Sequence, residues 1–437
     1  MDVAIIGSGV SGLVAAHRLS RRARVTVYEA APKPGGHVNT VEVETAAGPR
    51  AVDTGFIVFN DRNYPTFTRL LEELEVPSRR SEMSFSVSDG EFEYSSRSPN
   101  GLLARRANLV DPGFLRMIGE VPRFQRRLAE LVGAGPEGPS LGEVFAEGGY
   151  SRQFGERLIG PQVAAVWSAE PGALADFPAG LLARFFANHG MLSLRGRPRW
   201  RTVEGGSQRY VEALLREFQG RLRLSSPVTR VERFEDRVEV TAAGAGPGNG
   251  AGTGAGAGPG TGAEPEAYDQ VVIATHSDQA LAMLADPDRL ERQVLGAIEY
   301  RRSNAVLHTD RSLLPRRRRA WASWNYHLDP EQRGPVAITY LMNLLQGLDC
   351  EQELCVTLNR EDRIDPARVI SRLEYEHPAY TAESWAAQGR WGEVSGRRRT
   401  HYCGAYWGYG FHEDGAASGA RAAEAVLGAP VPAGAPG

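Results

Sequence analysis

Residues 3–29 read VAIIGSGVSGLVAAHRLSRRARVTVYE, and this stretch decides the fold. An apolar run over residues 3–6 leads into the glycine-rich turn of residues 7–12, and apolar residues then recur at helical spacing. A second apolar run, residues 25–28, ends at the acidic Glu29. A strand, a glycine turn, a helix and a second strand in this order predict a βαβ unit that binds a dinucleotide.

Each position of the glycine turn has a mechanical reason. Gly7 allows the tight turn, Gly9 lets the backbone approach a pyrophosphate, and Gly12 lets the helix pack closely on the strand. The N-terminus of the helix offers N–H groups to the phosphates. Glu29 follows the glycines by about 20 residues, where a carboxylate can accept both ribose hydroxyls. The expected contacts from this unit are Gly7, Ser8, Gly9, Val10, Ser11, Gly12, Glu29 and Ala30.

A second glycine motif follows Glu29. Residues 30–40 read AAPKPGGHVNT, and residues 53–60 read DTGFIVFN. The glycine pair resembles the second FAD motif, GGRxxT, of the flavin amine oxidase and phytoene desaturase superfamily, although a simple turn would favour the same residues. The resemblance implies FAD contacts from Gly35, Gly36, His37, Val38, Gly55, Phe56, Ile57 and Val58.

The third motif lies near the C-terminus, where residues 401–423 read HYCGAYWGYGFHEDGAASGARAA. Residues 415–423 resemble the small-residue helix whose N-terminus faces the flavin pyrimidine in this superfamily. Gly404 matches a glycine that contacts the pyrophosphate, although Ala405 replaces the usual acid. The resemblance therefore implies non-covalent FAD, with further contacts from Val228, Ala274, Gly404, Gly410, Phe411, His412 and Gly415.

Because the three motifs span the chain, the resemblance implies an α/β fold, in which a Rossmann-like, amine oxidase-like FAD-binding domain is interleaved with an α+β substrate domain. The expected FAD-binding segments are residues 1–64, 201–276 and 396–430, and the expected substrate-domain segments are residues 65–200 and 277–395. Residues 243–266 are almost only Gly, Ala, Pro and Thr. Such a composition buries too little apolar surface to offset its ordering entropy, so we expect a disordered insertion there.

Local patterns predict individual elements outside the motifs. A helix is expected from near Pro65, with Phe67, Leu70, Leu71 and Leu74 on one face. Another is expected after the cap Ser207, with Tyr210, Val211, Leu214, Leu215 and Phe218 inward. The segment from residue 65 to about residue 200 is expected to be helical. Strands are expected over residues 221–224, 227–234, 237–241, 268–274 and 336–342.

Composition excludes several classes of protein. The net charge of −3 and the pI near 6.4 give no general reason to bind nucleic acid. No apolar run approaches the roughly 18 to 20 residues of a membrane helix, and a strand that begins at residue 2 leaves no room for a signal peptide. The three cysteines, Cys350, Cys355 and Cys403, are too few for a disulfide framework or a metal site. We expect a cytoplasmic protein without a bound metal.

The cations are almost all arginine, and Lys33 is the only lysine. Many flavin amine oxidases are understood to use a lysine that holds a water against flavin N5, whereas Lys33 lies in the dinucleotide-binding region. His37 also stands where the superfamily has the arginine of its GGR motif. Both departures weaken the case for an ordinary amine oxidase.

A narrower resemblance comes from residues 406–415, YWGYGFHEDG, together with residues 36–40 and 53–60. These residues look like a branch of bacterial FAD-binding oxidoreductases that is associated with cyclopropane fatty-acid synthase-type methyltransferases. The resemblance implies chemistry on fatty-acyl chains, with a lipid methyltransferase as partner.

The flavin edge is expected to carry the chemistry. The aromatic residues expected near the ring are Phe56, Phe59, Tyr406, Trp407, Tyr409 and Phe411. His412 and Glu413 are the titratable pair that the motif places there, so they are candidates for acid and base; alternatively, Glu413 or Asp414 caps the last helix. Four functions remain open: hydride transfer to or from an apolar acyl substrate, flavin-dependent double-bond isomerisation, amine oxidation, and a non-catalytic FAD module that supports a methyltransferase.

Two arginine-rich segments bear on where the protein resides. Residues 315–326 read PRRRRAWASWNY, and residues 102–118 mix Arg105, Arg106 and Arg116 with Leu, Phe and Met. Arginines beside amphipathic aromatics suit an anionic membrane surface, which predicts peripheral contact with the inner face of the membrane. A solvated charge run beside a core strand is the alternative.

Overall fold

The first apolar run forms the middle strand of a parallel sheet. The computed structural model describes residues 1–135, 137–167, 174–192, 198–243, 264–328 and 337–428. Within them, β1 (Asp2–Ile6) lies between β2 (Arg24–Tyr28) and β14 (Gln270–Ile273). The five-stranded sheet has the order β10-β2-β1-β14-β20, and each neighbouring pair is parallel. Its outer strands are β10 (Arg221–Arg223) and β20 (Thr400–Tyr402).

Both faces of β1 are buried, as is usual for a strand inside a parallel sheet. Val3 and Ile5 pack against helices α1 (Val10–Leu19) and α15 (His412–Val426). Ala4 and Ile6 point to the opposite side and pack against a three-stranded antiparallel sheet. That sheet consists of β11 (Val228–Arg233), β12 (Val238–Ala242) and β13 (Glu266–Tyr268). The predicted α/β fold is confirmed.

The prediction of one strand over residues 268–274 is wrong, because this stretch contributes to two strands. Tyr268 ends β13, which pairs with β12, whereas β14 pairs with β1. Asp269 lies at the break, where its backbone N–H donates to the carbonyl of Asp2 at 2.9 Å. Two polar residues, Asp269 and Gln270, stand at the break, but such a pair also occurs within single strands and does not indicate a change of sheet.

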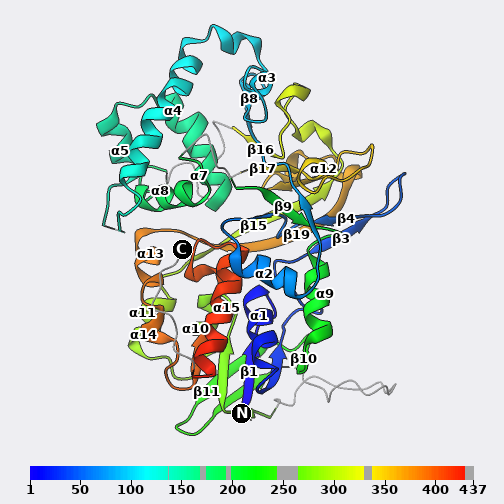
Figure 1. Ribbon diagram of the computed structural model, residues 1–437, viewed down its shortest axis with the longest axis vertical. Helices are drawn as coiled ribbons and strands as arrows, with labels where there is room; N and C mark the ends of the chain where they lie inside the picture. The colour runs from blue at the N-terminus through cyan, green and yellow to red at the C-terminus, as the bar shows by residue number, and fades with distance from the viewer. Residues whose placement is uncertain (136, 168–173, 193–197, 244–263, 329–336, 429–437) are drawn as a thin grey trace.

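A seven-stranded mixed sheet occupies the middle of the molecule. Its order is β19-β15-β18-β17-β16-β7-β8, and all neighbours are antiparallel except β16 and β7. Figure 1 shows the helices α4, α5, α7 and α8 on the upper side of the molecule and α1 and α15 in its lower half. The strands are β7 (Phe85–Ser88), β8 (Glu93–Ser95), β15 (Tyr300–His308), β16 (Trp324–His327), β17 (Ile338–Leu341), β18 (Cys355–Leu358) and β19 (Val369–Pro378).

Shorter strands complete the middle of the molecule. β3 (Thr40–Val43) pairs with β4 (Arg50–Asp53), and β9 (Trp200–Val203) lies between β5 (Phe59–Asn60) and β6 (Ser78–Arg80). The expectation that residues 65–200 are helical is therefore wrong for β6, β7 and β8. The helices of this half are α3 (Pro99–Leu102), α4 (Pro112–Glu130), α5 (Leu141–Gly148), α6 (Arg152–Phe154), α7 (Gly160–Trp167), α8 (Ala179–Asn188) and α12 (Met342–Leu345).

Several helices from the expected substrate-domain segments pack beside the parallel sheet. α2 (Pro65–Glu73), the helix predicted from near Pro65, buries Phe67, Leu70 and Leu71 in the same cluster as α1. On the other side of the sheet, one apolar cluster joins Val271 to four further helices. These helices are α10 (Ser277–Met283), α11 (Arg289–Leu295), α13 (Ala382–Gln388) and α14 (Trp391–Val394).

Helix α9 (Gln208–Glu217) begins where the sequence predicts, but the Ser207 side chain does not cap it. The Ser207 hydroxyl donates to the Asp53 carboxylate at 2.8 Å instead, and the Ser207 backbone N–H donates to the same carboxylate at 2.9 Å. Asp53, at the end of β4, therefore holds the N-terminus of α9. Tyr210, Val211 and Leu214 are buried, as predicted.

No helix in the described part of the chain is both long and apolar enough to cross a membrane. Residues 244–263, which contain most of the expected insertion, lie outside the described residues. The strands that flank them are neighbours, because Val240 of β12 pairs with Glu266 of β13.

We predict that replacing residues 244–262 with a short turn preserves the fold. β12 and β13 are antiparallel neighbours, so a hairpin loop of about 2 to 5 residues can join them. Loop length also changes closure entropy only slowly. Soluble yield, thermal unfolding and bound cofactor should match those of the full chain. A shortened chain that is insoluble or lacks cofactor would show that these residues contribute to folding.

Candidate functional site

A cavity of 1420 Å³ runs between the two halves of the molecule. Its lining extends from the N-terminus of α1, past β15 and β19, to α4, α7 and α8. Pockets for one small ligand typically occupy about 300–1,000 Å³. This cavity can therefore hold a cofactor together with a second ligand.

The end of the cavity at α1 is shaped for a pyrophosphate. Gly7 adopts φ +100°, which allows the turn, and a side chain on Gly12 would overlap the Gly7 carbonyl. At Gly9, by contrast, a Cβ would meet no protein atom within 4 Å. The N-terminus of α1 has no side-chain cap and no acidic residue in its first turn. Its N–H groups and its positive end can therefore bind an anion.

Glu29 follows β2 and lines the same end of the cavity. One carboxylate oxygen accepts hydrogen bonds from the Ser8 backbone N–H at 2.8 Å and from the Ser8 hydroxyl at 2.5 Å. The other oxygen accepts from the Ala31 N–H at 2.8 Å. A carboxylate has about four lone-pair sites, so these bonds orient Glu29 and leave capacity for a ribose hydroxyl.

The structure brings most of the predicted dinucleotide contacts together. The cavity lining includes Gly7, Ser8, Gly9, Val10, Ser11, Glu29, Ala30, Gly35, Gly36, His37, Gly55, Phe56, Ile57, Val58, Val228, Ala274, Gly404, Gly410, Phe411 and His412. Gly12, Val38 and Gly415 lie behind this lining. Gly12 packs on Gly7, Val38 is fully buried, and a Cβ on Gly415 would lie 2.6 Å from Val10. These three residues support the wall without forming it.

His412, the first residue of α15, reaches the cavity but is held on several sides. Its Nε2 lies 2.6 Å from the Tyr210 hydroxyl, and its ring stacks on Phe56 with centroids 3.6 Å apart. Burial lowers the pKa of His412 well below its usual value, and the neighbouring His37 lowers it further. The imidazole is therefore neutral near pH 7 and has no imidazolium proton to give.

Glu413 does not line the cavity. Its carboxylate oxygens accept hydrogen bonds from the backbone N–H groups of Thr66 and Phe67, both at 2.9 Å. These residues lie in the first turn of α2, so Glu413 caps a helix, as one alternative proposed, but the helix is α2. Asp414 caps α15 itself by accepting from the Phe411 N–H at 2.8 Å. The geometry gives no support to Glu413 as an acid or base.

The aromatic residues expected near the flavin divide into two groups. Phe56, Tyr406, Tyr409 and Phe411 line the cavity. The other two are buried elsewhere: Trp407 packs in the cluster beneath the parallel sheet and Phe59 in the cluster around α1 and α2. Glycines mark the turns around these residues in the sequence, but they do not indicate which aromatic ring turns inward.

One wall of the cavity was not predicted by any motif. It comes from the segment after β14, from β15 and from β19 and its end, and consists of His276, Tyr300, Tyr375, Glu376, His377 and Tyr380. These residues meet the second glycine motif only through tertiary packing, since the His37 ring lies 5.3 Å from Tyr375 and 5.4 Å from His377. Sequence spacing holds no signal for such a contact.

The histidines of this wall are uncharged near pH 7. Burial lowers the pKa of His37 to about 3, with further lowering by His377 and His276, and burial lowers the pKa of His377 to about 4. Nε2 of His37 lies 3.2 Å from the Glu376 carbonyl oxygen. Because a carbonyl only accepts, His37 carries its proton on Nε2. The wall therefore offers neutral hydrogen-bonding groups next to the glycine motif.

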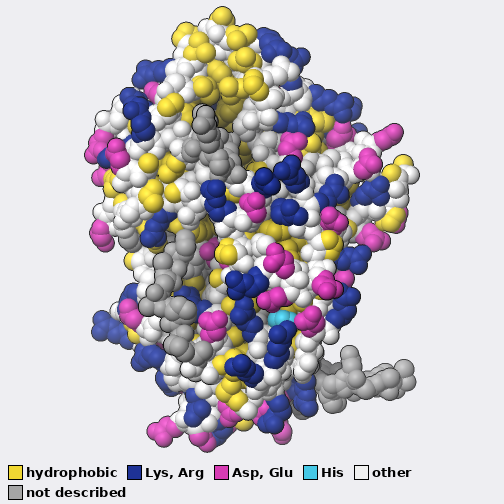
Figure 2. Space-filling model, viewed as in Figure 1, with side chains coloured by type: hydrophobic (Ala, Val, Ile, Leu, Met, Phe, Trp, Pro, Cys, Tyr) yellow, Lys and Arg dark blue, Asp and Glu magenta, His cyan; other side chains and the backbone are white. Residues whose placement is uncertain are grey.

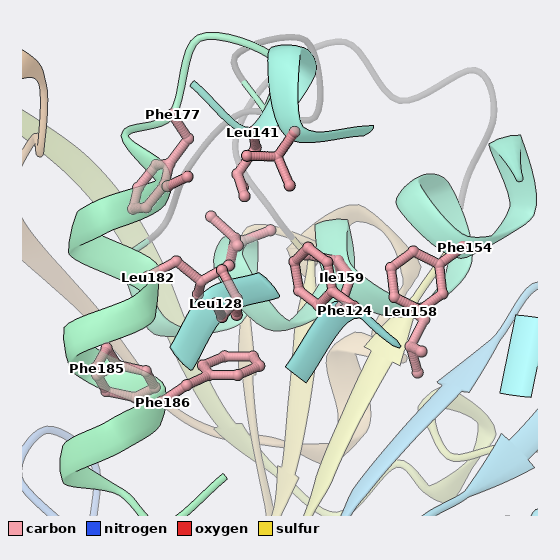
Figure 3. Close-up of a cluster of buried hydrophobic side chains, with 14 of the residues drawn as sticks. Phe124, Leu128, Leu141, Phe154, Leu158, Ile159, Phe177, Leu182, Phe185 and Phe186 are labelled. Carbon is pink, nitrogen blue, oxygen red and sulfur yellow. The ribbon is translucent and has the colours of Figure 1, made fainter. Parts of the chain in front are cut away.

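The far end of the cavity is apolar. Figure 3 shows the side chains gathered there from α4, α6, α8 and the π-helical turn Gly155–Ile159, with further apolar residues behind them. Those that line the cavity include Phe124, Phe154, Leu158, Ile159, Leu182, Phe185 and Phe186. None of the described residues of α4 to α8 that line the cavity is charged. This end suits a hydrocarbon and excludes water.

No lysine or cysteine lines the cavity within the described residues. Lys33 donates to the side chain of Asn39, and Cys403 is fully buried in the core between the parallel sheet and α15. Burial raises the pKa of the Cys403 thiol to about 12, so it is not a thiolate near pH 7. The described residues also contain no group of histidine, cysteine and carboxylate side chains that could hold a metal.

Residues 10–338 match the family model of flavin containing amine oxidoreductases, whereas no curated protein matches the sequence. Several solved structures share the fold. A CLA-producing fatty acid isomerase from P. acnes gives a TM-score of 0.66 at 16% identity, covering 95% of this chain and 96% of its own. Cyclohexylamine oxidase from Brevibacterium oxydans IH-35A gives 0.68 at 16% identity, covering 98% of both chains. Wild-type putrescine oxidase bound to putrescine gives 0.67 at 14% identity, covering 98% and 99%.

At these identities the solved structures show only a shared fold, and the match to the family model identifies the cofactor. The cofactor is FAD, and the cavity fits it: the α1 N-terminus is uncapped, Gly9 leaves space for a pyrophosphate, and Glu29 is oriented for a ribose.

We predict that Gly9→Ala yields folded protein that binds FAD poorly. The new methyl group meets no protein atom within 4 Å, so it occupies only the space for the pyrophosphate. Overpacking of this kind costs about 1–3 kcal/mol, or about 5- to 150-fold in affinity. Thermal unfolding of the apoprotein and FAD titration measure the two effects. Gly12→Ala is the matched control and should disrupt folding as well, because its methyl group overlaps the Gly7 carbonyl. Unchanged FAD affinity in Gly9→Ala would contradict the assignment.

We predict that Glu413→Gln lowers stability by about 1 kcal/mol and leaves the rate of flavin reduction unchanged, because it weakens the cap of α2. Denaturant unfolding and single-turnover flavin reduction separate the two roles. A slowed reduction in a variant of normal stability would restore Glu413 as a catalytic candidate.

Proposed function

This chain belongs to the flavin-containing amine oxidoreductase family, and we propose that it transfers a hydride to or from a fatty-acyl chain. FAD, when bound, accepts or donates the hydride at N5. The observation that supports this proposal most directly is the apolar far end of the cavity. There, Phe124, Phe154 and Phe186 surround a space that continues to the glycine turn.

The charges around the cavity disfavour an amine substrate. The charged residues among its described lining are Glu29, Arg80, Arg199 and Glu376. Glu29 already accepts three hydrogen bonds at the dinucleotide end, and Glu376 lies 3.5 Å from His276. An ammonium group entering the far end would lose its hydration and find no carboxylate there. An acyl chain carries no charge along its length, so it gives up no hydration of a charged group on entering the same space.

The neutral walls support the same chemistry. His37, His377 and His189 are each held uncharged by burial, and the pKa of His189 is lowered to about 4. Because these histidines carry no charge, they hold fewer waters near the reacting carbon than imidazolium groups would. Chemistry at an unactivated C–H or C=C bond therefore proceeds in a dry site, where competing reactions with water are suppressed.

Isomerisation of a double bond is the second candidate. A fatty acid isomerase is among the solved structures that share this fold, and such a reaction needs the same apolar cavity but no net transfer of electrons. The resemblance to the branch associated with cyclopropane fatty-acid synthase-type methyltransferases supports the choice of an acyl chain in both cases. It also supports a lipid methyltransferase as the partner of this chain.

We predict that, in the absence of oxygen, long-chain acyl substrates reduce the bound flavin in a single turnover or reoxidise chemically reduced flavin. Putrescine and cyclohexylamine should do neither. Ala165→Phe should slow the reaction with long chains by about tenfold or more and keep full FAD content, because its ring fills the far end of the cavity. Ala129→Phe, on the exposed side of α4, is the matched control.

The outcomes separate the candidate functions. Flavin reduction by an amine, with no response to acyl chains, would overturn the proposal. Conversion of an unsaturated chain to a positional isomer without net change in flavin absorbance would replace hydride transfer with isomerisation.

A further inference from the structure

The part of the molecule farthest from the N-terminus is a helical tip that exposes large apolar side chains. It comprises residues 99–118, which form α3, the short turn η1 (Arg106–Leu109) and the start of α4, at the top of Figure 1. Leu109, Val110 and Leu115 are 53%, 78% and 51% exposed. These values are the highest among the exposed large hydrophobic side chains of the described residues. The fold thus leaves these side chains exposed to solvent instead of burying them in the core.

Arginines surround this tip. Between residues 97 and 119 the chain carries Arg97, Arg105, Arg106 and Arg116. Three of them pair with acids: Arg97 with Glu82, Arg105 with Asp111 and Arg116 with Glu120. Arg106 is exposed and donates to the Asn100 side chain.

A second arginine segment reaches the same tip from a distant part of the sequence. Residues 316–319 are four consecutive arginines, and they lead into η5 (Arg318–Ala320), which contacts α3. A Cβ at Gly101 of α3 would lie 3.1 Å from the Arg319 carbonyl. Figure 2 shows hydrophobic atoms at the top of the molecule with dark blue basic groups on either side. The fold therefore brings both arginine segments beside the apolar tip. In the second segment, Arg317 pairs with Glu93 and Arg318 with Glu353, whereas Arg316 and Arg319 are exposed.

Helix α4 connects this tip to the cavity. Leu115 and Ile118 lie on the same helical face as Val121 and Gln125, at spacings of three and four residues. Val121 and Gln125 line the apolar end of the cavity, and Ile118 is partly buried against the same core cluster. One face of α4 thus runs from the exposed tip to the space that the proposed substrate occupies.

We infer that this tip docks on the surface of an anionic phospholipid bilayer. Leu109, Val110 and Leu115 enter the interface between headgroups and acyl chains, and the exposed Arg106, Arg316 and Arg319 bind the lipid phosphates. The orientation brings the apolar end of the cavity to the source of acyl chains, so the inference rests on the proposed function for its purpose. A second copy of this chain is a poor occupant, because a symmetric contact would set the arginines of both copies against each other.

Vesicle binding by the FAD-loaded full chain tests this inference. Vesicles of phosphatidylcholine with phosphatidylglycerol should sediment the protein, vesicles of phosphatidylcholine alone should bind it at least about tenfold less, and added salt should weaken binding. Val110→Asp combined with Leu115→Asp should lower binding to the anionic vesicles by about tenfold or more. Ile370→Asp, at an exposed apolar residue on β19, is the matched control and should bind as the unaltered chain does.

Flavin reduction distinguishes docking from the proposed function. The double variant should reduce flavin at the normal rate with a short acyl substrate in solution and slowly with the same acyl group held in anionic vesicles. Equal binding to both vesicle types, or no effect of the double variant, would overturn the docking surface. A tip-dependent dimer in the absence of lipid would replace the membrane with a second copy. Strong vesicle binding without any reaction of acyl chains would leave docking in place and remove the proposed function.

Discussion

The contact between α1 and α15 is the constraint on which the cofactor site depends. A Cβ on Gly419 would overlap the Ser11 carbonyl, and one on Gly415 would lie 2.6 Å from Val10, so the two helices touch along their backbones. Each helix begins at the cavity, because Gly9 lies before the first and Phe411 before the second. The first and last motifs of the chain therefore bring two helix N-termini to one cavity, and any larger residue at this seam would move both.

Carboxylates distinguish the helix N-termini that are structural from the one that binds the cofactor. Asp53 accepts from the N–H group preceding α9, Glu413 accepts from α2, and Asp414 accepts from the N–H at the start of α15. Burial raises the pKa of Asp53 to about 6 and that of Asp414 to about 7, so these caps lie in dry surroundings. α1 has no such acid, and its positive end remains for a phosphate. The attraction of a helix N-terminus for an anionic group thus stabilises the fold at α9, α2 and α15 and binds the cofactor at α1.

The sequence predicted those features of the structure that depend on residues close together in the chain. The glycine turn, Glu29 and the small-residue helix are set by backbone geometry within a few residues, and the structure brings their predicted contacts to one cavity. The partner of Glu413 was not local, because only the packing of α2 against α15 places the Glu413 carboxylate beside the Thr66 N–H. The aromatic and histidine wall around Tyr375 could not be predicted for the same reason, since it arises from contact between segments more than 300 residues apart. The break at Asp269 was not predicted, because the pattern of apolar residues does not indicate which sheet a strand joins.

The order of the parallel strands also governs how the chain can be made. β1 and β2 precede their partners by a long stretch of chain, because β1 needs β14 on its other edge, and β14 needs β20, which follows β14 by more than 100 residues. Until α15 follows, the apolar face of α1 and an edge of the sheet remain without a partner. Parallel pairings of such separation form slowly, because each must first close a long loop. The cofactor site therefore forms only after α1 and α15, which are about 400 residues apart in the sequence, have met.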